Sequence, residues 1–411
     1  MSRTLLQLLT TAVLITAAMT VHSCVQGPIY EDIYSVAGIT APTQVRIGLS
    51  PFLSVPSARI TIDSSFRATS PDGGRFLFDG TKLVNEEIAP FPEGITIGRA
   101  NRIYEKSVRI TPYLGGSILV GDRRFRGSLV IHASEMKISL VNEVDMEEYL
   151  AGVIAKEMSL SESPDALKAQ IVAARSYALH EVRSRPILRP TAIFDLYDDQ
   201  RSQVYGGICG DNALATRLVR ETRGEIVAFN NNVLKTYYSS TCGGHTEPAA
   251  EILDPGTRDI VPLSGRPCGK CSGSKYFAWE AVLTKRELIE KLFPDRKDIK
   301  DISSIRVTKT AKGGHALKIA IGLPGAKEIE VDANEGFRHK INRNAAGANK
   351  VLRSTLFTVV PSGSSYRFAG KGFGHAVGMC QTGAYQLARE GVPYDYILLY
   401  YYPGASVIKL Y

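Results

Sequence analysis

The sequence predicts an α+β fold in which a β-rich module precedes a helical segment. Short runs that alternate apolar with other residues recur between residues 44 and 140, separated by Gly, Pro and Asp. Apolar residues at helical spacing begin near residue 144. The 411 residues are 44% hydrophobic and 22% charged, which is ordinary for globular proteins and excludes a mainly disordered, collagenous or coiled-coil chain. This length accommodates two or three domains.

Residues 1–23 have the pattern of an export signal. Arg3 precedes an apolar run from Leu5 to Val21, and about 17 residues is short for a membrane span. The segment ends in Val21-His22-Ser23-Cys24, which resembles a bacterial lipobox, so we expect Cys24 to carry a lipid that anchors the protein to a membrane. A plain cleaved signal and an uncleaved anchor are the alternatives, because His22 stands where a small residue is usual.

Each of these alternatives predicts an exported protein of the cell envelope, on the periplasmic or outer-surface side. The chain has a formal net charge of +8, which fits a polyanionic partner such as nucleic acid or cell wall. Export argues against nucleic acid and leaves the cell wall.

The later elements follow in order along the chain. Residues 24–43 lack a clear period and predict a linker, and 44–140 predict the β-rich module. A first helix is expected over 144–158, and Ser163-Pro164-Asp165 marks the start of a second that runs to about 182. Two strands are expected over 224–239, a β-rich subdomain over about 284–360, and a last helix near 381–389, all within a domain that covers 141–408.

Glu157 continues an apolar stripe on the first predicted helix. Leu150, Val153 and Ile154 precede it at spacings that place all four residues along one side. Burial raises the pKa of a carboxyl group, which prepares a general acid for use at neutral pH. The alternative is a structural glutamate paired with a buried cation, and Arg175 on the next helix is a candidate partner.

Four cysteine and histidine residues have the spacing of a structural zinc site. Cys242-Gly-Gly-His245 is followed by Cys268-Gly-Lys-Cys271. Three thiolates and an imidazole would close a tetrahedral shell around Zn²⁺ and leave no open position for chemistry. Disulfide bonds are the alternative, because exported cysteines can oxidise. We expect Cys209 and Cys380 to be small buried residues.

A glycine-rich segment at 370–379 contains His375. Glycine allows the backbone to approach a ligand closely or to adopt positive φ. The segment lacks the Gly-Lys-Thr ending of a phosphate loop. His375 is therefore either a substrate-binding residue or a hydrogen-bonded structural one.

Taken together, several stretches in fixed order resemble the SpoIID/LytB family, the stage II sporulation protein D type of peptidoglycan-active proteins. They are Val141–Leu150 with Gly152-Val153, Glu157-Met158, Ala166–Gln170, Ala173–Ala178, Gln203–Gly207, Tyr238–Ser240, Gly243–Glu247, Gly372–His375, Val377–Met379, Gln381, Gly383-Ala384 and Tyr401–Gly404. Order and spacing hold across about 140–405, and the β-rich part from residue 44 looks like the usual lead-in.

The resemblance implies a lytic transglycosylase with a groove for the glycan strands of peptidoglycan, preferably strands without stem peptides. Glu157 matches the catalytic glutamate of the family, and Arg175 matches a position expected beside it. His375 and Gln381 match groove residues, and Lys168 and Tyr177 within matching stretches are further candidates for substrate binding.

The resemblance also supports a zinc site and one competing function. The family zinc pattern supports His245, Cys268 and Cys271, whereas Cys242 stands where serine is common and is a fourth ligand by spacing alone. Because LytB-type members are described as amidase enhancers, a glycan binder without catalytic activity that stimulates a cell-wall amidase is the main alternative. A structural envelope lipoprotein is the third.

Overall fold

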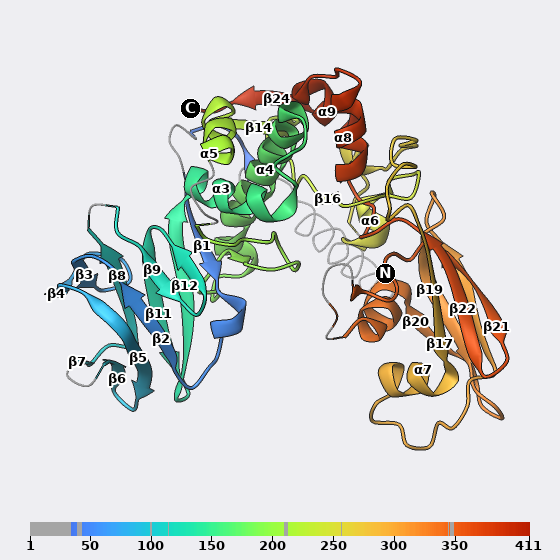
Figure 1. Cartoon of the computed structure of the whole chain (residues 1–411), viewed down its shortest axis with the longest axis horizontal. Helices are drawn as coiled ribbons and strands as arrows, with labels where there is room; N and C mark the ends of the chain where they lie inside the picture. Colours follow the sequence, from blue (N-terminus) through green and yellow to red (C-terminus); the bar gives the residue numbers. More distant parts are fainter. Residues whose placement is uncertain are drawn as a thin grey trace, which may run out of the picture.

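A computed structural model describes residues 34–38, 43–98, 101–113, 115–208, 213–255, 257–343, 345 and 349–411. The export signal expected at 1–23, the lipidation site Cys24 and most of the linker lie outside these residues. The described residues include no helix that is long and apolar enough to span a membrane. Helices and several separate sheets occur together, which confirms the α+β prediction (Figure 1).

Two sheets, whose strand pairs are antiparallel except for one parallel pair at the edge of the first, form the β-rich module near the N-terminus, drawn mainly in blue and cyan in Figure 1. The strands of the first sheet, in spatial order, are β13 (Leu196–Tyr197), β1 (Gln44–Gly48), β12 (Lys137–Asp145), β11 (Ser128–Ser134), β8 (Ser107–Pro112), β3 (Phe66–Thr69) and β4 (Phe76–Gly80). Those of the second are β10 (Arg123–Phe125), β9 (Ile118–Val120), β2 (Ala58–Ile62), β5 (Leu83–Phe91), β6 (Gly94–Ile97) and β7 (Asn101–Ile103). A 3₁₀ turn, η1 (Ser50–Phe52), follows β1. The β1–β12 register pairs Val45 with Val144.

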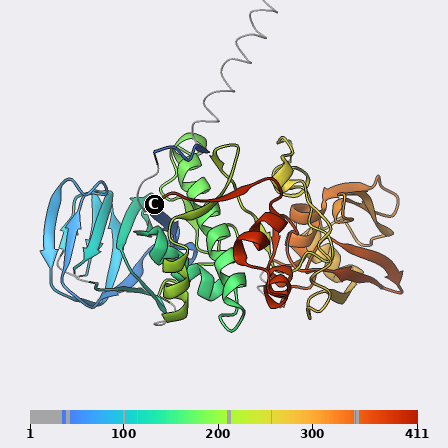
Figure 2. The same ribbon diagram turned by 90° about the horizontal axis from the view of Figure 1, so that it is seen from above.

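A cluster of helices lies beside this module, as seen from above in Figure 2. Its helices are α3 (Met146–Glu157), α4 (Pro164–Leu188), α5 (Ala213–Glu221), α6 (Ala249–Ile252), α8 (Gln381–Arg389) and α9 (Tyr394–Tyr401). Two small sheets join distant parts of the chain. One consists of β15 (Asn232–Val233), β14 (Glu225–Phe229) and β24 (Ser406–Lys409). In the other, β16 (Tyr238–Ser239) pairs in parallel with β23 (Met379–Cys380). One apolar core extends from the β-rich module into these helices.

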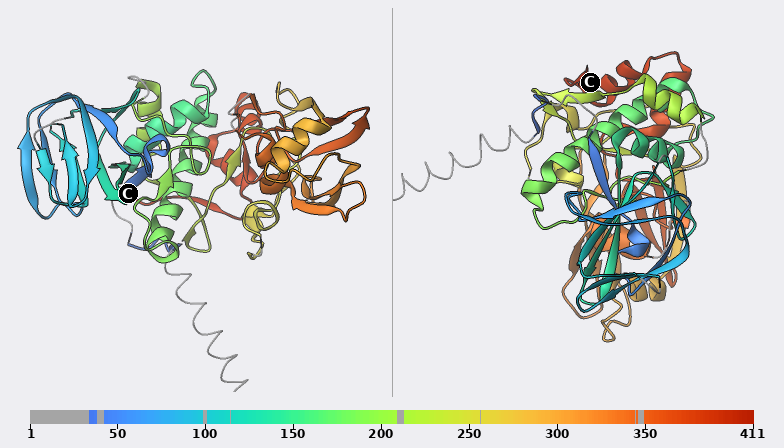
Figure 3. Two further views of the ribbon diagram at one scale, coloured as in Figure 1. Left: turned by 90° about the horizontal axis from the view of Figure 1, so that it is seen from below. Right: turned by 90° about the vertical axis from the view of Figure 1, so that its left-hand side faces the viewer.

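Residues 278–371 form a subdomain with a core of its own, drawn in orange in Figure 1. It contains two three-stranded sheets. The first consists of β17 (Ala278–Thr284), β22 (Ser365–Lys371) and β21 (Phe357–Ser362). The second consists of β18 (Ser304–Thr310), β19 (Ala316–Gly322) and β20 (Ile329–Asp332). Helix α7 (Lys285–Leu292) begins at a capping box of Thr284 and Glu287, and η3 (Ala333–His339) follows β20. The turn η2 (Val261–Leu263) precedes the subdomain. Figure 3 shows it at the far end of the molecule from the β-rich module.

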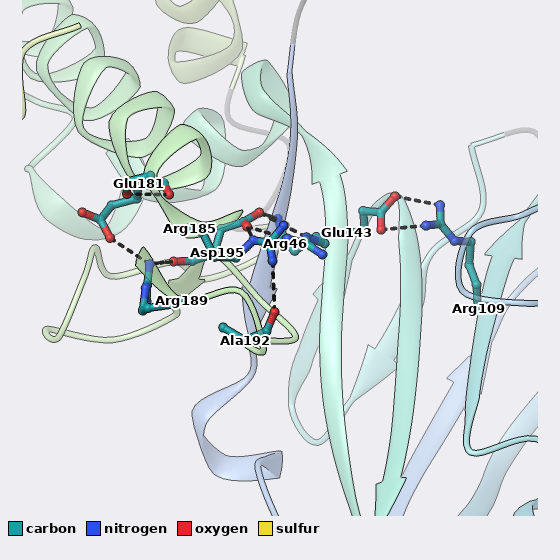
Figure 4. Close-up of polar contacts among 9 residues, drawn as sticks. Arg46, Arg109, Glu143, Glu181, Arg185, Arg189, Ala192 and Asp195 are labelled. Atoms are coloured by element: carbon teal, nitrogen blue, oxygen red, sulfur yellow. Dashed lines mark hydrogen bonds and ion pairs between the residues drawn. The ribbon is translucent and has the colours of Figure 1, made fainter. Parts of the chain in front are cut away.

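Asp195 links the β-rich module to the helices. Its side chain is 2% exposed and lies between Arg46 of β1, at 2.8 Å, and Arg185 of α4, at 2.6 Å (Figure 4). Two guanidinium groups neutralise the buried carboxylate, which is costly to bury alone. Arg189 and Glu181 extend the contacts along α4. These pairs fix α4 against β1 and so fix the helices that carry the candidate site.

Candidate functional site

Glu157 is the last residue of α3, and its carboxylate is held by two hydrogen-bond donors. Asp145 caps the start of α3 by accepting from the backbone N–H of Glu147, so the helix continues directly from β12. Oε1 of Glu157 accepts from the backbone N–H of Val204 at 2.8 Å, and Oε2 accepts from Nε2 of Gln381 at 3.5 Å. The side chain keeps partial exposure. The carboxyl group is therefore oriented by the protein yet still accessible.

The surroundings of Glu157 favour the protonated carboxyl group. Burial raises its pKa, while the hydrogen bonds from Val204 and Gln381 oppose that shift. The negative end of the helix dipole also lies at the last residue of α3, which disfavours a negative charge there. This supports the sequence prediction of a prepared acid.

The contacts around Val204 fix the position of its N–H group. Gln203 accepts from the hydroxyl group of Tyr149 at 3.0 Å and donates to that of Tyr238 at 2.8 Å. Gly152 allows α3 to pack on this loop, because a Cβ atom there would lie 2.5 Å from the carbonyl oxygen of Gly207. Gln381 is held in turn through Gln170, whose Oε1 lies 3.4 Å from Nε2 of Gln381.

A cavity of about 250 Å³ lies on the other side of the same loop. Its lining is aromatic and polar: Tyr177, Gln200, Arg201, Ser202, Lys235, Tyr237, Tyr238, Leu253, Asp254 and His375. Tyr238 joins the two parts of the site, since it lines the cavity and the negative charge of Glu157 contributes to the raised pKa of its hydroxyl group. Aromatic walls with a few oriented polar groups are typical of a pocket for a polar organic ligand.

His375 lines this cavity as a neutral imidazole. Burial lowers its pKa to about 4, and the positive charge of Arg338 adds to the shift. Nδ1 accepts from the backbone N–H of Val377 at 3.0 Å. His375 and Tyr177 therefore share the cavity, and Gln381 lies at Glu157. Their assignment as substrate-binding residues stays a prediction.

Arg175 does not lie beside Glu157, and our expectation of that pairing was wrong. Its guanidinium is 1% exposed and binds both carboxylate oxygens of Glu147, at 3.0 and 2.7 Å. It also donates to the backbone oxygen of Glu225 at 2.9 Å. Arg175 thus ties α3 and α4 to β14. The sequence suggested a carboxylate partner for Arg175, but which carboxylate it meets depends on the packing of three elements.

We expect Arg175→Met to destabilise the fold and to leave substrate affinity of the folded fraction unchanged. Removing one partner of a buried ion pair leaves Glu147 uncompensated and costs about 3–5 kcal/mol. Urea unfolding followed by circular dichroism measures this loss, with the exposed pair residue Arg286→Met as control. A stability equal to that of the wild type would contradict the structural role.

Lys168 also lies away from Glu157 in the structure. Its amino group pairs with Glu221 of α5 at 2.7 Å and lies over the ring of Tyr394. Both contacts belong to the packing between α4 and its neighbouring helices. The structure therefore gives no support to its assignment as a substrate-binding residue.

Four buried cysteines gather in one group, and the fourth member is Cys380 instead of His245. The Sγ atoms of Cys242, Cys268, Cys271 and Cys380 all lie within 4.8 Å of one another. Cys380 reaches the group because β23 pairs with β16, just before Cys242. His245 points instead toward Gly313 of the subdomain, beside Glu247. Our prediction of His245 as a ligand is corrected accordingly.

The spacing of the four thiols suits a zinc ion. The Cys242 and Cys271 sulfur atoms are 3.6 Å apart. A tetrahedral site with Zn–S bonds of about 2.3 Å separates its sulfur atoms by about 3.8 Å. The residues present therefore fit the metal that the sequence analysis expected.

Sequence reasoning gave no role to Gln203, Val204, Tyr238 or Gln170. All four lie within the stretches that carried the family resemblance. The resemblance therefore pointed to these stretches, but it did not indicate which atoms form hydrogen bonds with each other. Val204 could not be found by residue type, because it contributes a backbone N–H group.

Comparison with known proteins matches two segments of the chain to families. Residues 134–229, which include Glu157 and the Val204 loop, match the family described as Stage II sporulation protein, SpoIID. Residues 268–378 match a domain of unknown function, DUF8618, and this segment covers the subdomain.

Three relatives from two organisms support the first match. An uncharacterized protein of Brachyspira hyodysenteriae is 32% identical over 69% of this chain and 72% of its own length. The stage II sporulation protein D of Bacillus subtilis is 28% identical over 69% of this chain and 82% of its own. The amidase enhancer of Bacillus subtilis is 29% identical over 63% of this chain but only 40% of its own length. The chain therefore belongs to the SpoIID family.

Proposed function

We propose that this protein is a lytic transglycosylase that cleaves peptidoglycan glycan strands between N-acetylmuramic acid and N-acetylglucosamine. The environment of Glu157 carries the proposal: a partly exposed carboxyl group with a raised pKa, oriented by Val204 and Gln381. A protein that only binds glycan has no need of such a group. The adjacent cavity with its tyrosines supplies a surface that suits a sugar ring.

The reaction needs one carboxyl group that acts twice. Protonated Glu157 donates its proton to the glycosidic oxygen as the bond from that oxygen to C1 of muramic acid breaks. The resulting carboxylate accepts the proton of the C6 hydroxyl group while O6 bonds to C1 and closes a 1,6-anhydro ring. No water is consumed, and Glu157 ends protonated again.

The other carboxylate of the cavity is engaged in a different contact. Asp254 accepts a hydrogen bond of 2.6 Å from the hydroxyl group of Tyr237. A hydrolysing glycosidase uses a second carboxylate as base or nucleophile. The anhydro reaction does not require one, so Asp254 can serve to orient Tyr237.

Digestion of purified glycan strands tests the proposal through its product. Strands freed of stem peptides are incubated with the full chain, and the ends are identified by mass spectrometry. We expect 1,6-anhydro-muramic ends that increase with time in the wild type and are absent with Glu157→Gln. Reducing ends in their place would indicate a hydrolase, and the absence of new ends would refute catalysis.

The second candidate is a glycan binder that stimulates a cell-wall amidase. It is favoured by the similarity to the Bacillus subtilis amidase enhancer. In that case Glu157→Gln would leave stimulation of an added amidase unchanged, and the wild type would produce no anhydro ends.

We further propose that the four-cysteine group holds a structural zinc ion. Its buried thiols have the distances of a closed tetrahedral site, which leaves no open position for substrate. The ion would join the two ends of the 278–371 subdomain, since Cys268 and Cys271 precede it and Cys380 follows it. We also propose that the protein is exported and anchored in the cell envelope through lipid on Cys24, which would place it next to the cell wall.

A further inference from the structure

Arg338 is a buried cation that forms no ion pair among the described residues, although Glu335, which pairs with His339, contributes a favourable charge nearby. It lies in η3 of the subdomain, and its side chain is 5% exposed. Nη1 makes one long hydrogen bond of 3.5 Å to the backbone oxygen of Gly374, and Nε has no hydrogen-bond partner. Buried arginines are almost always paired, because an isolated charge is costly to remove from water.

Lys350 is a second cation without a carboxylate partner in the described part of the chain. Its amino group donates to Oε1 of Gln200. Burial lowers its pKa, and the nearby positive charge of Arg338 contributes, so the two cations are close enough to repel each other. An anion between or beside them would relieve this repulsion.

Neither cation lines the cavity at the candidate site, but each contacts a residue on its lining or next to it. Arg338 contacts Gly374, whose neighbour His375 lines the cavity, and Lys350 contacts Gln200, which also lines it. The two cations that do line the cavity are neutralised: Lys235 pairs with Glu181 at 3.1 Å and Arg201 with Asp199 at 2.7 Å. Of these four cations, the two that form no ion pair among the described residues are the two that the subdomain contributes.

We propose that Arg338 and Lys350 form a subsite for a carboxylate group carried by the bound glycan. This subsite rests on the proposed function, because the carboxylate nearest a sugar in a peptidoglycan strand is the lactyl group of muramic acid. The planar guanidinium can donate two parallel hydrogen bonds to it. A stem peptide converts this carboxylate into a neutral amide. The two cations would therefore account for the preference for strands without stem peptides that the family resemblance implies.

The test is binding of defined oligosaccharides to the full chain. We would use a tetrasaccharide of alternating N-acetylglucosamine and N-acetylmuramic acid, with its carboxylates either free or converted to methylamides. The Glu157→Gln background prevents consumption of the ligand, and calorimetry measures affinity. We expect the free acid to bind about 10- to 100-fold more tightly than the amide. A third ligand, with L-alanine on the lactyl group, moves the carboxylate outward and should bind like the amide if the lactyl group itself is recognised.

Arg338→Met and Lys350→Met should reduce the preference for the free acid, and Arg338→Met should abolish most of it. Arg338→Lys should retain part of it, and the exposed Arg306→Met on β18 should leave it unchanged. A merely structural Arg338 would lower stability on replacement, whereas we expect an unchanged or higher unfolding midpoint, since an unpaired buried charge is removed.

Two results would overturn the subsite. One is a wild-type affinity that does not distinguish free acid from amide, and the other is a preference that survives in both Met variants. Failure of the proposed function is detected separately, because digestion of glycan strands then yields no anhydro ends even where the tetrasaccharides bind. If none of the tetrasaccharides binds, whatever the state of the carboxylate, the subsite is refuted as well.

Discussion

Replacing Glu157 by glutamine should lower the rate of glycan cleavage about a thousandfold, within the range that general acid–base catalysis contributes. Glutamine keeps the size of the side chain and the acceptor for the Val204 N–H group, but it has no proton to donate. The rate is measured as anhydro ends formed per minute from strands at saturating concentration. The matched control is Glu148→Gln, an exposed glutamate on the same helix. A rate within about twofold of the wild type would exclude Glu157 as the acid.

The same substitution should raise the stability of the protein at neutral pH. The pKa of Glu157 is raised in the folded state from its ordinary 4.5, so the native protein binds more protons than the unfolded chain above pH 4.5. Wild-type stability therefore falls as pH rises through the interval between 4.5 and the raised pKa, and a neutral glutamine escapes this loss. Melting temperatures from pH 4 to 8 should coincide at the acid end and separate toward pH 8. A lower melting temperature for the variant at pH 8 would contradict the buried-acid interpretation.

Replacing Cys380 by serine should release zinc and destabilise the fold by at least about 3 kcal/mol. Structural zinc contributes on the order of 10 kcal/mol to the folding of small metal domains, and a serine hydroxyl is a poor ligand compared with a thiolate. Elemental analysis of the reduced protein should give about one zinc per chain for the wild type and much less for the variant. Thermal unfolding with and without a chelator then measures the loss.

Two control variants separate the cysteine group from the zinc site that the sequence predicted. His245→Gln should keep its zinc, because Cys380 is the fourth member of the group. The second variant, Cys209→Ser, changes a residue that lies outside the described ones and that the sequence analysis did not assign to the site, and it should keep its zinc as well. Loss of zinc in His245→Gln with retention in Cys380→Ser would restore the original prediction, and a wild type with less than about half an equivalent would exclude the metal.

The sequence was sufficient for features that depend on local periodicity. The alternation between residues 44 and 140 predicted a β-rich module, and the spacing of Leu150, Val153 and Ile154 predicted the helix that ends at Glu157. Both patterns can be recognised within a short stretch of sequence, because a helix or strand presents residues on the same face at a fixed interval.

The errors concern partners chosen between distant elements. Arg175 was expected at Glu157 because a buried carboxylate is usually paired with a cation and because the family resemblance places an arginine beside the glutamate, but the packing of α3 against α4 brings Glu147 to it. His245 was preferred to Cys380 because it is close to Cys242 in sequence, whereas the β16–β23 pairing brings Cys380 across from the C-terminal part. Arg338 carried no local signal at all, since its significance lies in having no ion pair among the described residues.

The subdomain leaves and rejoins the chain at a single point of the fold. Ala278, the first residue of β17, pairs directly with Lys371, the last residue of β22. Directly opposed residues of an antiparallel pair lie about 5 Å apart, so a link of a few residues could replace everything between them. Because its core is separate from the main one, the subdomain can be exchanged or removed as a cassette without altering the path of the chain around Glu157. Specificity for the strand could thus change by replacement of one module, while the acid and its supporting contacts stay the same.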